Sequence, residues 1–152
     1  MAATAERQSS HKLEVRHTYA QPPERLFRAW TTPNDLKRWH APRDLVVSLA
    51  ELDVRVGGRY RIHMRQPDGT EHRVSGEYTI VNPPRRLAFT WEWEQSDRAS
   101  LVTIDFLPWG TGGTELVLTH EDFPTDTERN NHEHGWSSIA EKLAGALADG
   151  GR

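Results

Sequence analysis

The segment TELVLTHEDFPTDTERNNHEHGWSSIAEKLAGAL (residues 114–147) decides the fold class, because it changes from a strand pattern to a helix pattern. Its first part predicts a strand at 114–120 with Leu116, Leu118 and His120 on one face. Thr125 and Glu128 have the spacing of a capping box. Apolar residues then recur every three or four positions, at Trp136, Ile139, Ala140, Leu143 and Leu147. We therefore expect an amphipathic helix of about twenty residues that ends at the glycine pair 150–151.

The sequence before this helix predicts a sheet that the helix must cover. Strand patterns occur at 13–19, 45–54, 59–65, 71–81, 87–93 and 100–107. Two short helices, at 22–30 and 34–40, separate the first strand from the second. The strands from 45 onward follow one another through short turns, which favours a mainly antiparallel sheet. Only the last helix is long enough to cover the apolar face, so we expect an α+β protein whose curved sheet wraps around that helix. Such wrapping leaves a cavity where the lining residues do not meet.

Composition excludes several classes of function. The chain has 152 residues, from which we expect a disordered lead-in at 1–12 and a single domain at 13–149. A formal net charge of -3 argues against a general affinity for nucleic acid. No apolar run approaches the roughly 18 residues of a membrane span, so we expect no membrane partner. The sequence contains no cysteine, which excludes disulfides, thiolate catalysis and cysteine-based zinc sites and fits a cytoplasmic location.

Five stretches in a fixed order resemble a known family. They are PPERLFRAWTTPNDLKRW (22–39), LDVRVGGRYRIHMRQPDG (52–69), GEYTIVNPPRRLAFTWEW (76–93), GGTELVLTHEDFP (112–124) and HGWSSIAEKLAGAL (134–147). Together they resemble the activator-of-Hsp90-ATPase homologue 1-like (AHSA1-like) family of the START-like superfamily, also called Bet v 1-like or SRPBCC. The resemblance covers about residues 13 to 148. One departure is His40 after Trp39, where many members carry two aromatic residues, and it predicts a more polar side of the cavity mouth.

This resemblance implies a helix-grip fold, in which a curved antiparallel sheet surrounds a long C-terminal helix and encloses a cavity. It also implies relatives that bind lipids, sterols, hormones or polyketides, some of which are aromatases or cyclases. Eukaryotic Hsp90 activators carry another domain before this one, whereas the first strand here begins near residue 13. We therefore do not expect stimulation of Hsp90, since a shared fold does not carry function by itself. We expect no cofactor.

Aromatic and aliphatic residues on the apolar faces are either core or the lining of a small-molecule cavity. The family resemblance favours the lining for those nearest the last helix, and it places Trp30 and Trp39 at the cavity mouth. The predicted ligand-binding residues are Trp30, Trp39, Tyr60, Ile62, Met64, Tyr78, Phe89, Trp91, Phe106, Leu118, His120, His132, Trp136 and Ile139. On the opposite face of the strand at 59–65, Arg59, Arg61, His63 and Arg65 are expected to be solvated, with a homodimer contact as the alternative.

The histidines between the last predicted strand and the start of the last helix have three interpretations. His132 and His134 resemble a metal-binding pair, but residues two apart on a helix point about 200° from each other, so we predict no metal site. His120 is either a structural histidine bonded to the backbone or a group that orients a ligand. In an enzyme, His120, His132 or Tyr78 would be the general acid or base. Gly135 inside the helix is either a tolerated weak point of the helix, a sign of close approach between helix and sheet, or room for a ligand.

Three functions remain open at this stage. The first is a non-enzymatic, cofactor-free protein that binds an apolar or aromatic small molecule, lipid-like or polyketide-like, between the sheet and the last helix. The second is a cyclase, dehydratase or hydrolase that uses the same cavity. The third is a protein-interaction module of the co-chaperone kind.

Overall fold

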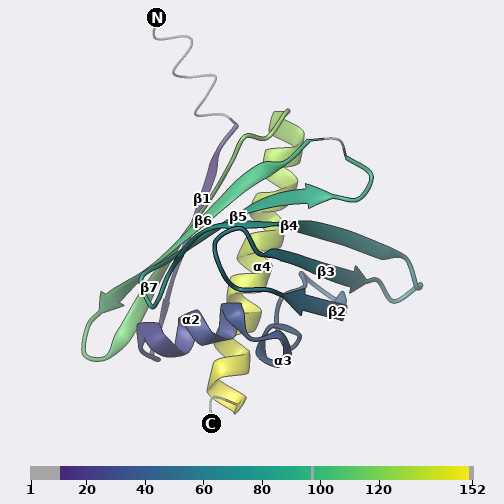
Figure 1. The fold of residues 1–152 in the computed structure, drawn as a ribbon. Helices are drawn as coiled ribbons and strands as arrows, with labels where there is room; N and C mark the ends of the chain where they lie inside the picture. The colour runs from purple at the N-terminus through teal and green to yellow at the C-terminus, as the bar shows by residue number, and fades with distance from the viewer. Residues whose placement is uncertain (1–10, 97, 151–152) are drawn as a thin grey trace, which may run out of the picture.

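A single curved sheet and one long helix form the body of the protein. The structure, a computed structural model, describes residues 11–96 and 98–150 (Figure 1). The elements are β1 (Leu13–Tyr19), α2 (Pro23–Thr31), α3 (Pro33–Leu36), β2 (Val46–Leu52), β3 (Arg59–Arg65), β4 (Glu71–Asn82), β5 (Arg86–Trp93), β6 (Ser100–Trp109), β7 (Gly113–Glu121) and α4 (Asp126–Gly150). Most of the lead-in expected at 1–12 lies outside the described residues.

The sheet has seven strands in the order β1-β7-β6-β5-β4-β3-β2, and every neighbouring pair is antiparallel. Helix α4 runs across one side of the curled sheet, and α2 and α3 lie near its C-terminal half (Figure 1). The predicted α+β helix-grip fold is therefore confirmed, including the two short helices after the first strand. The first and last strands of the chain, β1 and β7, pair at one edge of the sheet, with Leu13 opposite His120.

Alternation along the strands separates a buried face from a solvated face. In β3, Tyr60, Ile62 and Met64 are buried while Arg59 and Arg61 are exposed. This is the burial pattern that period-two alternation predicts, because successive strand side chains point to opposite faces. The buried faces of the strands and one side of α4 form a single core that includes Phe106, Leu118 and Leu143.

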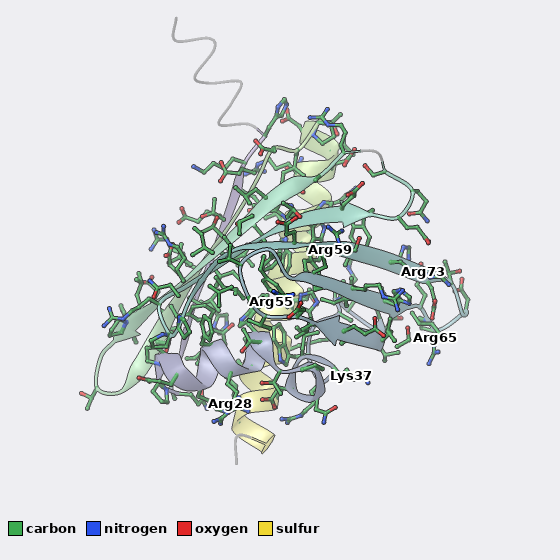
Figure 2. The ribbon with its side chains drawn as sticks, in the orientation of Figure 1. Arg28, Lys37, Arg55, Arg59, Arg65 and Arg73 are labelled. Atoms are coloured by element: carbon green, nitrogen blue, oxygen red, sulfur yellow. The ribbon has the colours of Figure 1, made fainter. Side chains whose placement is uncertain are left out.

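The solvated face carries paired charges rather than one continuous basic surface. Figure 2 labels Arg59 and Arg65 on β3 and Arg73 on β4. Arg73 lies 3.2 Å from a carboxylate oxygen of Glu71, and Arg59 lies 4.0 Å from one of Glu77. Exposed pairs of this kind contribute little to stability. The homodimer contact considered for this face stays a prediction.

Neighbouring residues determine where helices α4 and α3 begin. The amide of Glu128 donates to Oγ1 of Thr125 at 3.2 Å, which confirms the predicted cap. The second short helix, predicted at 34–40, ends at Leu36 and begins at Pro33, because proline is well suited to the first helical position. Within residues 11–96 and 98–150, no helix combines the length and the apolar character that crossing a membrane requires.

Candidate functional site

A pocket of about 580 Å³ lies between the sheet and α4. The sheet contributes residues of β3, β4 and β5, α4 contributes one side of its N-terminal half, and the segment 42–45 closes a third side. The lining residues are Pro42, Arg43, Asp44, Leu45, Met64, Gln66, His72, Trp91, Trp93, Asn131, His132, Gly135, Trp136 and Ile139. Arg43, Asp44 and Asn131 are exposed, so the pocket reaches solvent on that side. Volumes of this order suit a small molecule.

Three indole rings make the pocket largely aromatic. The ring of Trp91 is centred 4.9 Å from that of Trp136 and 5.4 Å from that of Trp93. Trp91 and Trp93 are nearly perpendicular, at 87°. Both come from β5, where residues two apart share a face, while Trp136 comes from α4. Met64 and Ile139 add flexible and aliphatic surface beside these rings. Trp91 and Trp136 are 4% and 3% exposed, so only a small part of each ring faces the pocket, whereas Trp93 is half-buried.

The segment 41–45 is fastened to α4 by polar contacts. The Lys142 ammonium donates to the carbonyl oxygens of Ala41, at 2.6 Å, and Leu45, at 3.2 Å. Between these two points, the amide of Arg43 donates to Oγ of Ser138 at 2.8 Å. Burial lowers the pKa of Lys142. Because the contacts flank Pro42 on both sides, this wall of the pocket has a defined distance from the helix.

His132 lines the pocket with both of its ring nitrogens already bonded. The indole N–H of Trp93 donates to Nε2 of His132 at 3.0 Å. An indole N–H can only donate, so Nε2 is the acceptor and Nδ1 carries the proton. Nδ1 donates that proton to the carbonyl of Glu128 at 2.7 Å. Burial lowers the pKa of His132, which keeps the ring neutral. This histidine therefore fixes Trp93 against α4.

His120 and Ser100 resemble a nucleophile and its base, but the proton is on the wrong nitrogen. The indole N–H of Trp136 donates to Nδ1 of His120 at 2.9 Å, so Nε2 carries the proton. Nε2 lies 2.6 Å from Oγ of Ser100 and donates to it. The hydroxyl proton of Ser100 then points to the carbonyl of Trp91, at 3.2 Å. A base must accept a proton from its nucleophile, so this chain of bonds does not activate Ser100.

The burial of His120 agrees with a structural role. Its side chain is fully buried, and burial lowers its pKa well below the ordinary histidine value, with neighbouring His132 as a smaller cause. The two imidazole rings are centred 5.2 Å apart. Tyr78, the third acid–base candidate, is on β4 outside the pocket lining, and burial raises its pKa. Within residues 11–96 and 98–150, no three acidic or imidazole side chains group as a metal site.

The structure divides the predicted ligand-binding residues among three locations. Lining the large pocket are Met64, Trp91, His132, Trp136 and Ile139. Around a separate internal space of about 10 Å³, enough for about one water molecule, are Trp30, Tyr60, Ile62, Tyr78 and Phe89. Buried outside both sets are Trp39, Phe106, Leu118 and His120. Trp30 and Trp39, expected at the mouth, are 3% and 2% exposed and pack on each other with ring centres 4.6 Å apart.

Sequence reasoning missed much of the polar part of the pocket. Gln66 directly follows β3, His72 lies at the start of β4, and the two side chains hydrogen bond to each other. Trp93 is not among the predicted ligand-binding residues, although the alternation of β5 already places it on the same face as Trp91. The loop at 42–44 has no periodicity, and Leu45, predicted as the first residue of a strand, directly precedes β2. No signal in the sequence indicates that this segment returns to α4.

His40 lies inside the aromatic core, not at a polar mouth. It is 1% exposed, and its ring is centred 5.6 Å from that of Trp30, 5.6 Å from that of Trp136 and 6.0 Å from that of Trp91. Nδ1 of His40 has no hydrogen-bond partner among the described residues. Burial lowers the pKa of His40 to about 4. A neutral imidazole is therefore part of the core packing.

Comparison with known proteins connects this geometry to a family. The sequence profile of the family described as "Activator of Hsp90 ATPase homolog 1-like protein" matches residues 20–148. Curated relatives named "Activator of 90 kDa heat shock protein ATPase homolog 1", from mouse and from human, are each 28% identical over 129 residues. The match covers 82% of this chain, which spans about a third (33%) of the length of those relatives.

Solved structures agree with the sequence comparison. An AHSA1 protein from Silicibacter pomeroyi is 33% identical, with a TM-score of 0.81 over 90% of this chain and 97% of that one. A structure described as an HSP90 activator from Plasmodium falciparum is 27% identical, with a TM-score of 0.70 over 91% of this chain and 96% of that one. The expected resemblance is confirmed: this chain belongs to the Activator of Hsp90 ATPase homolog 1-like family and has its START-like fold.

Proposed function

We propose that this protein binds a small apolar or aromatic molecule in the pocket between the sheet and α4. One observation carries the proposal: Trp91, Trp93 and Trp136 line a single pocket of about 580 Å³. Burial of a ligand against indole rings supplies most of the affinity, and the polar groups at the open side orient it. The polar residues at that side are Arg43, Asp44 and Asn131. A cytoplasmic location remains part of the prediction.

The binding is proposed to be non-enzymatic, because the acid–base candidates have other bonds. The ring nitrogens of His120 and His132 all have hydrogen-bond partners in the fold. General acid–base catalysis needs an atom that can donate or accept a proton within hydrogen-bond reach of the substrate. For either histidine to act on a ligand, a tryptophan, a serine or a backbone carbonyl would first have to lose its partner. The cyclase, dehydratase or hydrolase alternative therefore has less support than binding.

A ligand screen tests the binding proposal. Purified protein is analysed by native mass spectrometry for copurifying small molecules and by thermal shift against a broad panel of apolar and aromatic compounds. Binding should raise Tm and change the fluorescence of the pocket tryptophans, since a ligand that binds only the folded state stabilises it. The matched variants are Trp93→Leu, which removes a pocket ring, and Trp109→Leu, which removes an exposed ring at the end of β6 outside the pocket lining. A panel without any stabilising compound contradicts the proposal.

A second candidate function is that of an Hsp90-activator-like module. The matches to curated Hsp90 ATPase activators and to the Plasmodium structure favour it. Because the chain covers only 33% of the curated relatives, their activity is not carried over as a whole. The test is the ATPase rate of a bacterial or eukaryotic Hsp90 with and without this protein at increasing ratios. A rate that stays constant while thermal shift detects a ligand separates the two functions.

A further inference from the structure

Arg43 lies at the open side of the pocket with a backbone conformation that suits glycine. The amide of Leu45 donates to the carbonyl oxygen of Pro42 at 3.0 Å, so Arg43 and Asp44 are the central residues of a tight turn. Arg43 has a φ of 51°, and Asp44 is not among the residues with a positive φ. Turns with a positive φ at the first central position alone favour glycine there, because a side chain strains this conformation. The turn therefore carries a long charged side chain at a cost in free energy.

The bonds that hold this turn do not involve the guanidinium of Arg43. The backbone amide of Arg43 donates to Oγ of Ser138, and the Lys142 ammonium donates to the carbonyl oxygens of Ala41 and Leu45 on either side of the turn. The guanidinium itself has no hydrogen bond or ion pair with any residue that the structure describes. The side chain thus strains the turn without stabilising it through a polar contact, so a contact with another molecule is the role that remains.

The charges at the open side of the pocket leave this guanidinium without a negative partner. Arg43 and Asp44 are the arginine and the carboxylate that line the pocket among the described residues. Burial lowers the pKa of Lys142 and the charge of nearby Asp44 opposes this shift, so Asp44 already faces a positive group of the protein. Both Arg43 and Asp44 are exposed. A ligand that reaches this side of the pocket therefore meets one positive charge that no described carboxylate pairs with.

We propose that Arg43 is a specificity-determining residue that binds the carboxylate of an aromatic or apolar carboxylic acid held in the pocket. This inference rests on the proposed binding function and adds the chemical class of the ligand. The planar guanidinium donates two parallel hydrogen bonds to a carboxylate, a geometry that a neutral amide cannot match. The apolar part of the acid lies in the pocket beside the half-buried ring of Trp93. The bonds to α4 hold the backbone of Arg43 in place, so its side chain starts from a fixed point at the pocket mouth.

Two pairs of probes test the ligand class. 2-Naphthoate and 2-naphthamide share one ring system, indole-3-acetate and indole-3-acetamide share another, and only the acid of each pair is charged at neutral pH. Isothermal titration calorimetry with the wild-type protein should show, in at least one pair, a Kd for the acid that is lower than that of the amide by about fivefold or more. Amides that bind as tightly as the acids in both pairs overturn the inference while the proposed function stands. Absence of binding by all four compounds also overturns it, and the broader ligand panel then decides the proposed function.

Variants at two exposed turns test the role of Arg43. Arg43→Gly should raise Tm, because glycine adopts a positive φ without strain, and should raise the Kd of the acid by about fivefold or more while the Kd of the amide stays the same. Arg43→Lys keeps the charge without the planar pair of donors and should give an intermediate Kd for the acid. Arg85→Gly is the matched control, since Arg85 is exposed in the turn after β4, lies outside the pocket lining and is not among the residues with a positive φ.

The control should leave the Kd of the acid unchanged and should not raise Tm, although it removes the same charge. A lower Tm for Arg43→Gly, or an equal rise in the Kd of the acid for both glycine variants, refutes the inference. An acid that binds wild type and Arg43→Gly with the same Kd refutes it too, but leaves the proposed binding function standing.

Discussion

Acidification should destabilise this protein through His40, the imidazole buried among four tryptophans. Burial lowers the pKa of His40 from 6.5 to about 4 in the folded state. Between these two pH values the unfolded chain binds a proton that the folded protein does not, so the free energy of unfolding falls as pH falls. The full difference corresponds to about 3 kcal/mol, of which about 2 kcal/mol is lost between pH 7 and pH 5. This is a large fraction of the stability of a typical domain.

The sign follows from which state holds the proton. Above pH 6.5 the imidazole is neutral in both states, and the stability is fully present. Below 6.5 the unfolded chain is protonated and the folded protein is not, until pH reaches about 4. His120 and His132, whose pKa values burial also lowers, act in the same direction. The free energy of unfolding that the parent protein loses on acidification should therefore exceed the contribution of His40 alone.

The variant His40→Phe isolates the contribution of His40 to the pH dependence of stability. Urea unfolding, followed by tryptophan fluorescence from pH 7 to pH 5, gives the free energy of unfolding for the parent and for His40→Phe. The variant should lose about 2 kcal/mol less than the parent over this range. Trp39→Phe is the control, because Trp39 packs on His40 with ring centres 5.3 Å apart and does not titrate. A parent whose stability is constant from pH 7 to pH 5, or a His40→Phe variant with the parent's pH dependence, would refute the reasoning.

Three further perturbations test the packing around the pocket. Trp136→Ala should lower the free energy of unfolding by about 3–5 kcal/mol, because Trp136 is 3% exposed and donates to His120; denaturant unfolding measures it, and a loss near zero contradicts the core placement. Thr125→Ala should cost about 1 kcal/mol through the lost cap, whereas exposed Thr127→Ala should cost less in the same assay. Lys142→Met should speed hydrogen exchange at the amide of Arg43, since it removes two bonds to the 41–45 segment; unchanged exchange means that Ser138 alone holds the loop.

The hydrogen bonds of His120 and His132 occupy both nitrogens of each ring. Each imidazole accepts from a tryptophan N–H and donates from its other nitrogen. The pairs connect β5, β7 and α4, because Trp93 is on β5, His120 is on β7 and the partners His132 and Trp136 are on α4. The histidines and tryptophans of these two pairs therefore form polar contacts between α4 and the sheet. Fully satisfied buried networks of this kind specify one packing arrangement.

The sequence by itself determined the order of elements, the buried faces of the strands and the family. Those features depend on local periodicity, as in Tyr60, Ile62 and Met64 on β3, and on motifs of neighbouring residues. The tertiary structure alone decided which aromatic residues line the pocket and which are core. Trp30 and Trp91 carry the same side chain on apolar faces, yet Trp91 reaches the pocket and Trp30 packs on Trp39.

The physical reason is the range of the interactions. Periodicity reports which side of an element is apolar, but not how far that side lies from the next layer. One wall of the pocket is the 41–45 segment, which Lys142 bonds to α4 across about a hundred residues of sequence. The proton positions on His120 and His132 likewise depend on tryptophans from other elements. Sequence alone places these residues on faces, and only packing decides whether a face meets another side chain or a ligand.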